Sequence, residues 1–358
     1  MSDDPNVRAA IAHWAPRFIA NGIDYNDFVA TTARVAHWRD WSVEWSRTAA
    51  QHEALAREAE AGGSLTSRAE AYVRASLCHH FGKFVCFDDM EQYRCAGDAT
   101  VADYRNAIAN LDPPAERIAI PYAGIDLPGY LRKPAAVERP PVVLIVCGLD
   151  SVKEEMNAFE PVFHRRGMAT LAFDGPGQGE SEALPIEPRF EAAVGAALDW
   201  LESRCDVAGR QVAAVGISLG GYYVARAAAF ERRLTCAAAV GGPYDLGAVF
   251  PTMPLISRQA IQIRSHSPDM STAAQRAREL TLVDSARRID MPFMTIFGTE
   301  DRLIPQQQAE RLHREIPHAG KRLLLLEGGN HVCNNMPYAW RPQLGDWIAG
   351  HFEWGRGV

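Results

Sequence analysis

The sequence predicts an α/β fold, with helices on both faces of a mostly parallel sheet, preceded by an all-helical domain. The 358 residues are enough for two domains, or for one large domain that carries an insertion. The first part of the chain has apolar residues at helical spacing and no strand pattern. After Pro113-Pro114, short apolar segments alternate with helical ones, which is typical of a parallel sheet buried on both faces.

Residues 1–112 form the predicted helical domain. Ala33 to Arg57 has tryptophans three and four residues apart, as on one face of a helix. Ser67 to Phe87 repeats the pattern and begins with a sequence that resembles a capping box. Gly62-Gly63 separates these two helices. Val101 to Leu111 is predicted to be a further helix, which ends before the double proline.

Residues 113–358 form the predicted sheet domain, in which strands alternate with helices. The predicted strands are Arg117–Pro121, Leu127–Lys133, Val142–Cys147, Ala169–Phe173, Gln211–Val215, Cys236–Val240, Phe293–Phe297 and Arg322–Leu326. The predicted helices are Glu154–Arg166, Arg189–Ser203, Gly220–Phe230, Gln306–Ile316 and Trp340–Phe352. About fifty residues separate the strands at Cys236 and Phe293, more than a crossover needs. Residues 249–280 are therefore predicted to be an inserted lid.

Composition and charge exclude several classes of protein. The chain is 47% hydrophobic and 23% charged, which excludes a disordered or collagen-like protein. With a formal net charge of −7, we expect no nucleic-acid partner. No segment approaches the ~18 apolar residues of a membrane span, and the N-terminus has no apolar signal segment. We therefore expect a cytoplasmic protein without membrane association, its irregularly spaced cysteines reduced.

The motif Gly216-Ile217-Ser218-Leu219-Gly220 carries the strongest functional signal. It follows an apolar strand and precedes a helix, which is the context that a G-x-S-x-G nucleophile elbow requires. Such an elbow forces the serine into a strained turn, where a side chain at either flanking position would crowd it. The motif predicts that Ser218 is a nucleophile, the alternative being a structural turn.

Two further groups follow the serine in the chain order serine, acid, histidine, which some Ser-His-Asp triads use. Asp301 lies just past a predicted strand, where catalytic groups of open α/β sheets are found. Its neighbour Glu300 is the rival acid and is expected to be solvated. His331 lies in a glycine-rich loop after the last predicted strand. It is the expected base, although a loop histidine can also be a surface or core residue.

These three side chains suffice for nucleophilic catalysis on an acyl group. His331 would take the proton of Ser218 and pass it to the leaving group, while Asp301 holds the imidazole tautomer. The developing oxyanion needs hydrogen-bond donors. We expect the backbone N–H of Leu219 to be one donor, and that of Leu149, in the loop after the first long strand, to be the other.

Two patterns resemble cofactor or metal motifs. The alternating glycines of Asp174 to Ser181 follow a strand, but the proline among them and the missing third glycine favour a tight loop over a dinucleotide site. A group of cysteines and histidines lacks metal-ligand spacing; its members are Cys78, His79, His80, Cys86 and Cys95. We therefore expect no cofactor and no metal, and His79 or His80 could instead face a substrate pocket.

Together with the elbow, three further segments make the chain resemble a subgroup of α/β-hydrolases that have a helical N-terminal domain. The three segments are Gly148–Glu155, Phe173–Glu180 and Asn330–Asn335, and the part of the elbow that matches is Ser218–Gly221. The subgroup includes 2,6-dihydroxypseudooxynicotine hydrolase, fungal melanin-pathway hydrolases that shorten polyketide chains, and esterases of the fermentation/respiration switch type. The resemblance implies the α/β-hydrolase fold, the triad Ser218, Asp301 and His331, a pocket between the helical domain and the sheet, a homodimer and no cofactor.

The best-matching members of this subgroup cleave a carbon–carbon bond beside a ketone. Such a member carries an extra acidic side chain after the sixth strand. Here Val249 to Thr252 holds no acid, and Asp245 lies too early unless the loop shifts. Ester cleavage needs no such group, because an alkoxide leaves more readily than a carbanion.

The sequence therefore predicts a serine hydrolase acting on a small, partly apolar or aromatic substrate, most simply a carboxylic ester. Hydrolysis of a β-diketone or aryl-ketone carbon–carbon bond is the first alternative; an acyltransferase and a hydrolase-fold binding protein without catalysis are the others. The candidate substrate contacts are Trp41, Trp45, His80, Phe81, Phe84 and Tyr222. The alternative role of the aromatic residues is to form the hydrophobic core.

Overall fold

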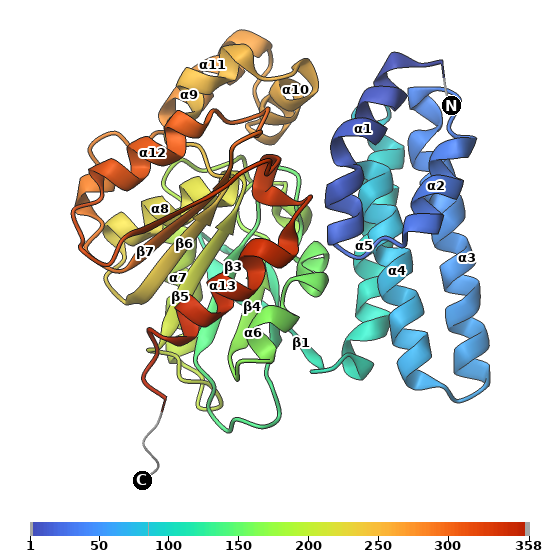
Figure 1. The fold of residues 1–358 in the computed structure, drawn as a ribbon. Helices are drawn as coiled ribbons and strands as arrows, with labels where there is room; N and C mark the ends of the chain where they lie inside the picture. The colour runs from blue at the N-terminus through green and yellow to red at the C-terminus, as the bar shows by residue number, and fades with distance from the viewer. Residues whose placement is uncertain (1–2, 85, 355–358) are drawn as a thin grey trace. The chain divides into compact units, whose positions relative to one another are not determined.

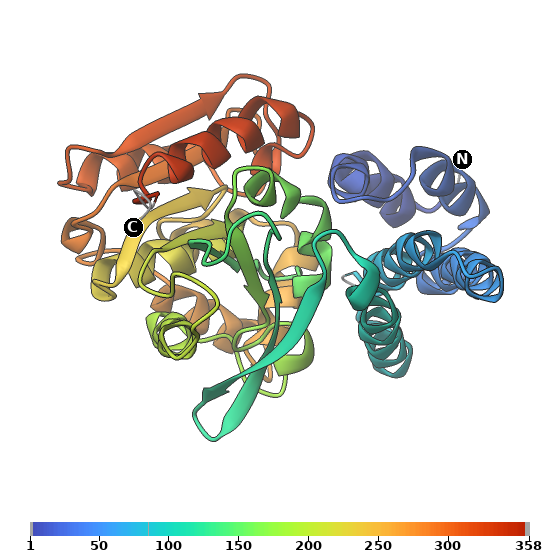
Figure 2. The ribbon, with the colours of Figure 1, turned by 90° about the horizontal axis from the view of Figure 1, so that it is seen from below.

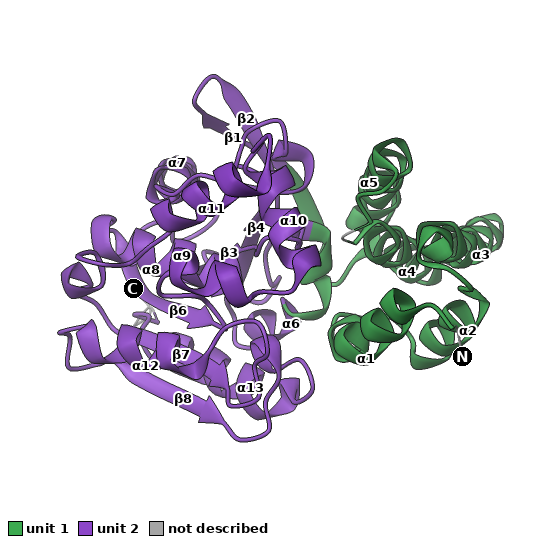
Figure 3. Cartoon of the chain, turned by 90° about the horizontal axis from the view of Figure 1, so that it is seen from above, with its two compact units in different colours: residues 1–117, 154–159 green, residues 118–153, 160–358 purple. Residues whose placement is uncertain are grey.

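The computed structural model describes residues 3–84 and 86–354, which divide into two compact units (Figure 3). Unit 1 comprises residues 1–117 together with 154–159, and unit 2 comprises 118–153 and 160–358. The segment 154–159, which we expected within the sheet domain, thus belongs to the helical unit. Residue 85, part of our predicted helix Ser67–Phe87, lies outside the described residues. Among the described helices, none is both long and apolar enough to span a membrane.

Unit 1 is built from helices, as the sequence predicts (Figure 1). The α-helices are α1 (Pro5–Ala20), α2 (Tyr25–Arg34), α3 (Trp41–Ala61), α4 (Leu65–Lys83) and α5 (Met90–Ala107). Two short 3-10 helices accompany them, η1 (Trp38–Asp40) and η2 (Ile108–Asn110). Helix α4 packs against both α3 and α5. Asp4, Asp24 and Asp89 cap α1, α2 and α5, because each carboxylate accepts a hydrogen bond from a free N–H of the first turn.

Two predicted helix starts in unit 1 are wrong. The predicted helix from Ala33 is interrupted after Arg34: Val35 and His37 are extended, and α3 begins only at Trp41. The predicted capping box at Ser67 lies inside α4, which begins at Leu65. In both places backbone turns outside the periodic pattern fix the helix start. Before α4 this turn contains Gly63, whose φ of +72° reverses the chain directly after α3.

Aromatic side chains fill the core of unit 1. The Phe18 and Phe81 rings stack with centroids 4.0 Å apart, and Trp41 and Trp45 pack edge-on against Phe18. The indole N–H of Trp41 donates to the carbonyl oxygen of Phe81 at 3.0 Å. That bond satisfies the polar end of a side chain that is only 1% exposed.

A buried carboxylate ties segment 154–159 to two helices of unit 1. Glu155 is 1% exposed and accepts hydrogen bonds from Arg17 of α1, from Asn21 directly after α1 and from His80 of α4, at 2.7–3.0 Å. Burial by itself would raise the pKa of Glu155, but Arg17 and His80 outweigh it and hold the pKa well below its usual range. Burial lowers the pKa of His80 despite this bond. The contact is therefore a carboxylate and a neutral imidazole.

Unit 2 is an eight-stranded sheet in the order β1-β2-β4-β3-β5-β6-β7-β8. The strands are β1 (Ala115–Tyr122), β2 (Ile125–Arg132), β3 (Val142–Val146), β4 (Ala169–Phe173), β5 (Val212–Ile217), β6 (Leu234–Val240), β7 (Phe293–Gly298) and β8 (Arg322–Leu326). Strand β2 runs antiparallel to β4, and all pairs from β4 to β8 are parallel. The turn at Ala123-Gly124, with positive φ at both residues, joins β1 and β2 into the long hairpin seen in Figure 2.

Helices cover both faces of this sheet, which confirms the predicted fold class. They are α6 (Pro161–His164), α7 (Glu191–Glu202), α8 (Leu219–Phe230), α12 (Gln306–Glu315) and α13 (Pro337–Ala349). The predicted helix Glu154–Arg166 is wrong: Lys153–Ala158 is a 3-10 helix, η3, and α6 begins afresh at Pro161. Proline has no backbone N–H to donate and fits the first turn of a new helix.

The predicted insertion is helical. It contains the 3-10 helix η5 (Phe250–Thr252), α10 (Leu255–Arg264) and α11 (Met270–Glu279), and α9 (Leu246–Val249) ends at its first residue. Helix α11 packs against both α9 and α10. Whether this segment moves as a lid stays a prediction.

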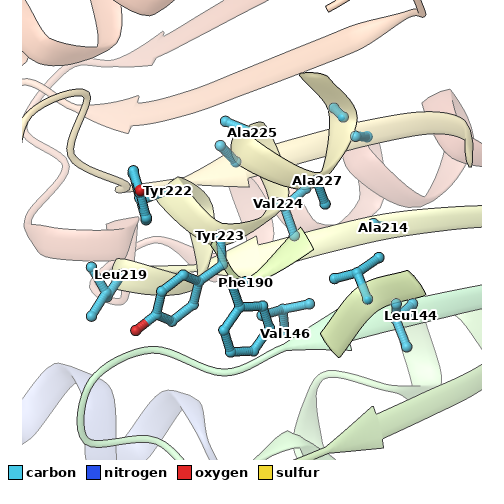
Figure 4. Close-up of a cluster of buried hydrophobic side chains, with 14 of the residues drawn as sticks. Leu144, Val146, Phe190, Ala214, Leu219, Tyr222, Tyr223, Val224, Ala225 and Ala227 are labelled. Atoms are coloured by element: carbon cyan, nitrogen blue, oxygen red, sulfur yellow. The ribbon is translucent and has the colours of Figure 1, made fainter. Parts of the chain in front are cut away.

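The core of unit 2 lies where β3 and β5 meet α7 and α8 (Figure 4). Every residue of β3 is buried, as the continuous apolar run predicts. Phe190, directly before α7, stacks on Tyr223 of α8 with ring centroids 4.0 Å apart. Small residues of α8, such as Ala225 and Ala227, let the helix lie close to the sheet.

The Glu155 contacts predict a pH dependence of stability. Replacing Glu155 by Gln should lower the free energy of unfolding by about 3 kcal/mol at pH 7, because Arg17 loses its buried partner. In the unsubstituted protein both His80 and Glu155 favour their deprotonated forms on folding. Stability is therefore full above about pH 6.5 and is lost as pH falls, first through His80 and then, below about pH 4.5, through Glu155.

Urea unfolding followed by tryptophan fluorescence between pH 3 and 8 measures this effect. The Glu155→Gln variant should lose less stability below about pH 4.5 than the unsubstituted protein, whereas Glu70→Gln, at an exposed position of α4, should lose as much. Equal pH profiles for the Glu155 variant and the unsubstituted protein would contradict the assignment.

Candidate active site

The backbone between β5 and α8 forms the sharp turn that the motif predicts. Ser218 has φ +56° and ψ −123°, a strained conformation that places its side chain at the top of the sheet. A Cβ at Gly216 would collide with the carbonyl of Gly220, and one at Gly220 would collide with that of Val146. The two glycines are therefore required by close backbone approach, and the turn holds one serine rigidly.

The structure brings the three predicted triad residues together. Ser218 Oγ lies 2.8 Å from His331 Nε2, and His331 Nδ1 lies 2.7 Å from Asp301 Oδ2. The second oxygen of Asp301 accepts the backbone N–H groups of Leu303 and Ile304 at 2.8 and 3.0 Å. Asp301 is completely buried at its side chain, so these bonds fix its orientation.

The rival acid, Glu300, is exposed, and it is Asp301 whose carboxylate contacts the imidazole. Backbone bonds join the loops that carry Asp301 and His331. Glu300 N donates to the carbonyl of Gly329 at 2.9 Å, and Gly328 N donates to the hydroxyl of Thr299 at the same distance. The acid and the histidine are therefore held in register although thirty residues separate them in the chain.

The loop after β3 runs directly against the elbow. A Cβ at Gly148 would lie 2.8 Å from the carbonyl of Ile217 and 3.1 Å from Ser218 Cβ, so only glycine allows this approach. The next residue, Leu149, lines the same pocket as Ser218 and Leu219. That is the placement an oxyanion site requires, although the two backbone donors stay predictions.

A small, mostly apolar pocket opens beside Ser218, within unit 2. It encloses about 50 Å³. Its lining residues are Leu149, Asp150, Ser218, Leu219, Pro243, Leu246, Met253, Ser257, Ile261, Leu303, Ile304 and His331. The helical insertion thus supplies several walls, including Met253 and Ile261. No sequence motif marks these two residues, since only the fold shows which side of each helix faces the serine.

The glycine-rich loop Asp174–Ser181 holds the loop after β3, residues 147–153, in place. Buried Gln178 donates from its amide to the carbonyls of Cys147 and Gly148, at 2.6 and 3.1 Å. Its amide oxygen accepts the N–H of Gly175 at 2.9 Å, which fixes the side chain. The sequence predicted a tight loop near the site, but gave no sign of this amide bridge.

A buried ion pair anchors the C-terminal end of the loop after β3. Lys153 Nζ lies 2.7 Å from Asp174 Oδ2 and 2.6 Å from Glu180 Oε2, and the lysine side chain is fully buried. The backbone N–H of Lys153 also donates to Asp174 Oδ1 at 3.0 Å. Residues 147–153 are thus held at both ends by one loop.

The predicted substrate contacts do not line the pocket beside Ser218. Trp41, Trp45, His80, Phe81 and Phe84 are each at most 4% exposed, within the core of unit 1. Tyr222 is buried in unit 2, where its hydroxyl donates to the carbonyl of Pro188 at 2.8 Å. Their contact with a substrate therefore stays a prediction. Asp245, the acid considered for carbon–carbon cleavage, caps α9 by accepting from Ala248 N at 3.0 Å.

Comparison with known proteins agrees with this geometry. The sequence matches the esterase FrsA-like family over residues 24–261 and the prolyl oligopeptidase family over 193–353. The 2,6-dihydropseudooxynicotine hydrolase of Paenarthrobacter nicotinovorans is 31% identical over 337 residues, which cover 93% of this chain and 90% of that protein. The crystal structure of 2,6-dihydroxy-pseudo-oxynicotine hydrolase superposes with a TM-score of 0.87 at 29% identity, covering 93% and 94% of the two chains.

A fungal relative matches over a shorter stretch. The 20-hydroxy-prefusarin hydrolase of Gibberella moniliformis is 32% identical over 242 residues, which cover 63% of this chain and 58% of that protein. The fold and these likenesses define the protein as a hydrolase of the α/β-hydrolase class. Within that class, the chain belongs to the FrsA-like esterase family, whose match spans more than half of its length.

The Gln178 bridge predicts a positioning role in turnover. Gln178→Ala should lower kcat by about 10- to 100-fold with little change in KM, because small displacements of an oxyanion donor cost that much. In Gln178→Glu the side chain has the same shape but cannot donate to the two carbonyls, so kcat should fall by as much as in Gln178→Ala. Gln306→Ala, on α12, is the matched control. Steady-state kinetics with an activated ester measure kcat and KM separately. A change confined to KM would contradict the positioning role.

Proposed function

We propose that the protein is a serine hydrolase that cleaves an acyl bond of a small, partly apolar substrate, most simply a carboxylic ester. One observation carries the proposal: Ser218, His331 and Asp301 form a continuous hydrogen-bonded chain that ends at a small apolar pocket. The elbow conformation and the burial of Asp301 support it, because both hold reacting groups in fixed positions before substrate arrives.

The geometry supports a two-step reaction through an acyl-enzyme. Ser218 Oγ attacks the acyl carbon while His331 Nε2 takes its proton, and Asp301 stabilises the resulting imidazolium. The backbone N–H groups of Leu149 and Leu219 would receive the oxyanion. The imidazolium then gives its proton to the departing alkoxide. In the second step His331 removes a proton from water, whose oxygen attacks the acyl carbon. The imidazolium then returns the proton to Ser218 Oγ as the bond to the serine breaks, which releases the acid and restores the free serine.

The size of the pocket supports a substrate that has a short group on one side of the bond to be cleaved. A volume of about 50 Å³ accommodates about four water molecules at ~10–15 Å³ each. That is close to the size of a short acyl chain. Leu219, Met253 and Ile261 would exclude water from this group, so the pocket favours an aliphatic acyl chain over a charged one.

Carbon–carbon hydrolysis is the second candidate, and one feature of the pocket favours it. A carbanion leaving group must be protonated as the bond breaks, which needs an acid near Ser218. Asp245 does not line the pocket, but Asp150 does. Likeness to 2,6-dihydropseudooxynicotine hydrolase over 93% of this chain also supports this candidate.

Two wider expectations accompany the proposal. All seven cysteines lie among the described residues and are free thiols, which supports a reducing compartment such as the cytoplasm. The expected homodimer has support only from the resemblance of the sequence, and size-exclusion chromatography with light scattering would test it.

A fluorophosphonate probe tests the nucleophile. It should label Ser218 of the unsubstituted protein, as located by peptide mass mapping, because only an activated serine attacks phosphorus at a useful rate. Ser218→Ala should show no labelling, and His331→Ala labelling slower by about 10³-fold or more, with circular dichroism unchanged. Label on another serine, or full turnover by Ser218→Ala, would refute the proposal. A folded protein that takes no label would instead favour a binding protein.

A substrate panel with one variant separates the two reactions. We expect p-nitrophenyl acetate or butyrate to be hydrolysed faster than p-nitrophenyl decanoate, because of the pocket size, and faster than a 1,3-diketone of matched size. Asp150→Asn should change ester turnover little. If the diketone is the better substrate and Asp150→Asn lowers its turnover by about 10²-fold or more, carbon–carbon hydrolysis is the function. Product formed only with an added alcohol acceptor would indicate an acyltransferase.

A further inference from the structure

Three ionisable side chains on three different helices converge inside unit 1, apart from the site described above. They are Glu53 of α3, His79 of α4 and Asp103 of α5. One ligand atom from each lies within 4.8 Å of the other two. His79 Nε2 is 3.2 Å from Glu53 Oε1 and 3.8 Å from Asp103 Oδ2.

These spacings match those of a bound divalent metal ion. Zinc bonds to imidazole nitrogen and carboxylate oxygen are ~2.0–2.2 Å long, so neighbouring ligands of a tetrahedral ion lie about 3.4 Å apart. The two measured distances lie on either side of that value. An imidazole with two carboxylates is also a chemically suitable donor set for zinc and similar transition metals.

The side chain of Asp103 gives an independent indication of a missing ligand. It is 9% exposed, and its Oδ2 atom, which faces His79, is buried and has no hydrogen-bond partner among the described residues. An unpaired buried acceptor is costly, and a cation would satisfy it. Two acidic side chains thus lie close to one imidazole, an arrangement that a cation would bridge.

Arg57 pairs with the other oxygen of Glu53, Oε2, at 3.5 Å, and its side chain is 60% exposed. Oε1 of Glu53 therefore stays directed to His79. The side chain of Glu53 is itself 28% exposed, which gives an ion a path from solvent.

We propose that Glu53, His79 and Asp103 form a binding site for a divalent transition-metal ion, such as zinc, that joins α3, α4 and α5. Three protein ligands leave at least one coordination position for water. The site is independent of the proposed hydrolase activity. Its expected role is structural, because an ion that binds only the folded unit stabilises it in proportion to its occupancy.

Zinc binding to the chelator-treated, full-length protein tests the site. Titration against a chromogenic chelator should give one high-affinity zinc ion per chain. His79→Gln and Asp103→Asn should each weaken this binding by at least about tenfold. His52→Gln is the matched control, since His52 is also a histidine of unit 1 but pairs with a single carboxylate, Asp27, at 2.8 Å. It should bind zinc as tightly as the unsubstituted protein.

Two further measurements keep the test decisive. X-ray absorption at the zinc edge should show nitrogen and oxygen ligands at ~2.0–2.1 Å and no sulfur. Zinc should raise the Tm of the unsubstituted protein and of His52→Gln, but not that of Asp103→Asn. Absence of stoichiometric zinc binding would overturn the proposal. So would equal affinity in all four proteins, or sulfur ligation, since either outcome would place the ion elsewhere on the chain.

Discussion

The strained turn at Ser218 is the constraint on which unit 2 depends. A positive φ at a residue with a side chain is costly and persists only when its surroundings enforce it. Here the enforcement comes from backbone contacts at Gly148, Gly216 and Gly220, where any Cβ would collide with a neighbouring strand or with the start of α8. The close approach of β3, β5 and α8 therefore produces both the sheet core and the exposed hydroxyl. Stability and chemistry share one set of contacts.

Around this turn, polar groups are fixed by other polar groups and not by apolar packing. Asp301 is held by two backbone N–H groups, the loop after β3 by the amide of Gln178, and Lys153 by two carboxylates. The bonds of Gln178 and the pair between Lys153 and Asp174 are buried, so breaking one of them leaves an unsatisfied group in a medium of low polarity. This is how a site built mainly from loops becomes rigid enough to preorganise a reaction.

Unit 1 uses buried charge in two different ways. At Glu155, three donors surround one carboxylate, and the pairing is complete. At Asp103, a carboxylate faces another carboxylate and one imidazole, and its Oδ2 atom lacks a donor among the described residues. The first arrangement fastens a segment distant in sequence to the helices. The second carries electrostatic cost that a cation would remove, which is why we interpret it as a binding site.

The sequence by itself determined the succession of the eight strands, the elbow at Ser218 and the identity of the residues that meet there, because these follow from local periodicity and short motifs. It also placed Asp301 and His331 correctly after β7 and β8, since the ends of parallel strands gather at one edge of a sheet. Only the tertiary structure decided which distant side chains pair: Gln178 with the loop at Cys147, Glu155 with α1 and α4, and Glu53 with His79 and Asp103. It also decided where η3 replaces the predicted helix at Glu154. Such contacts join segments separated by tens of residues, and packing geometry, which no local pattern encodes, brings them together.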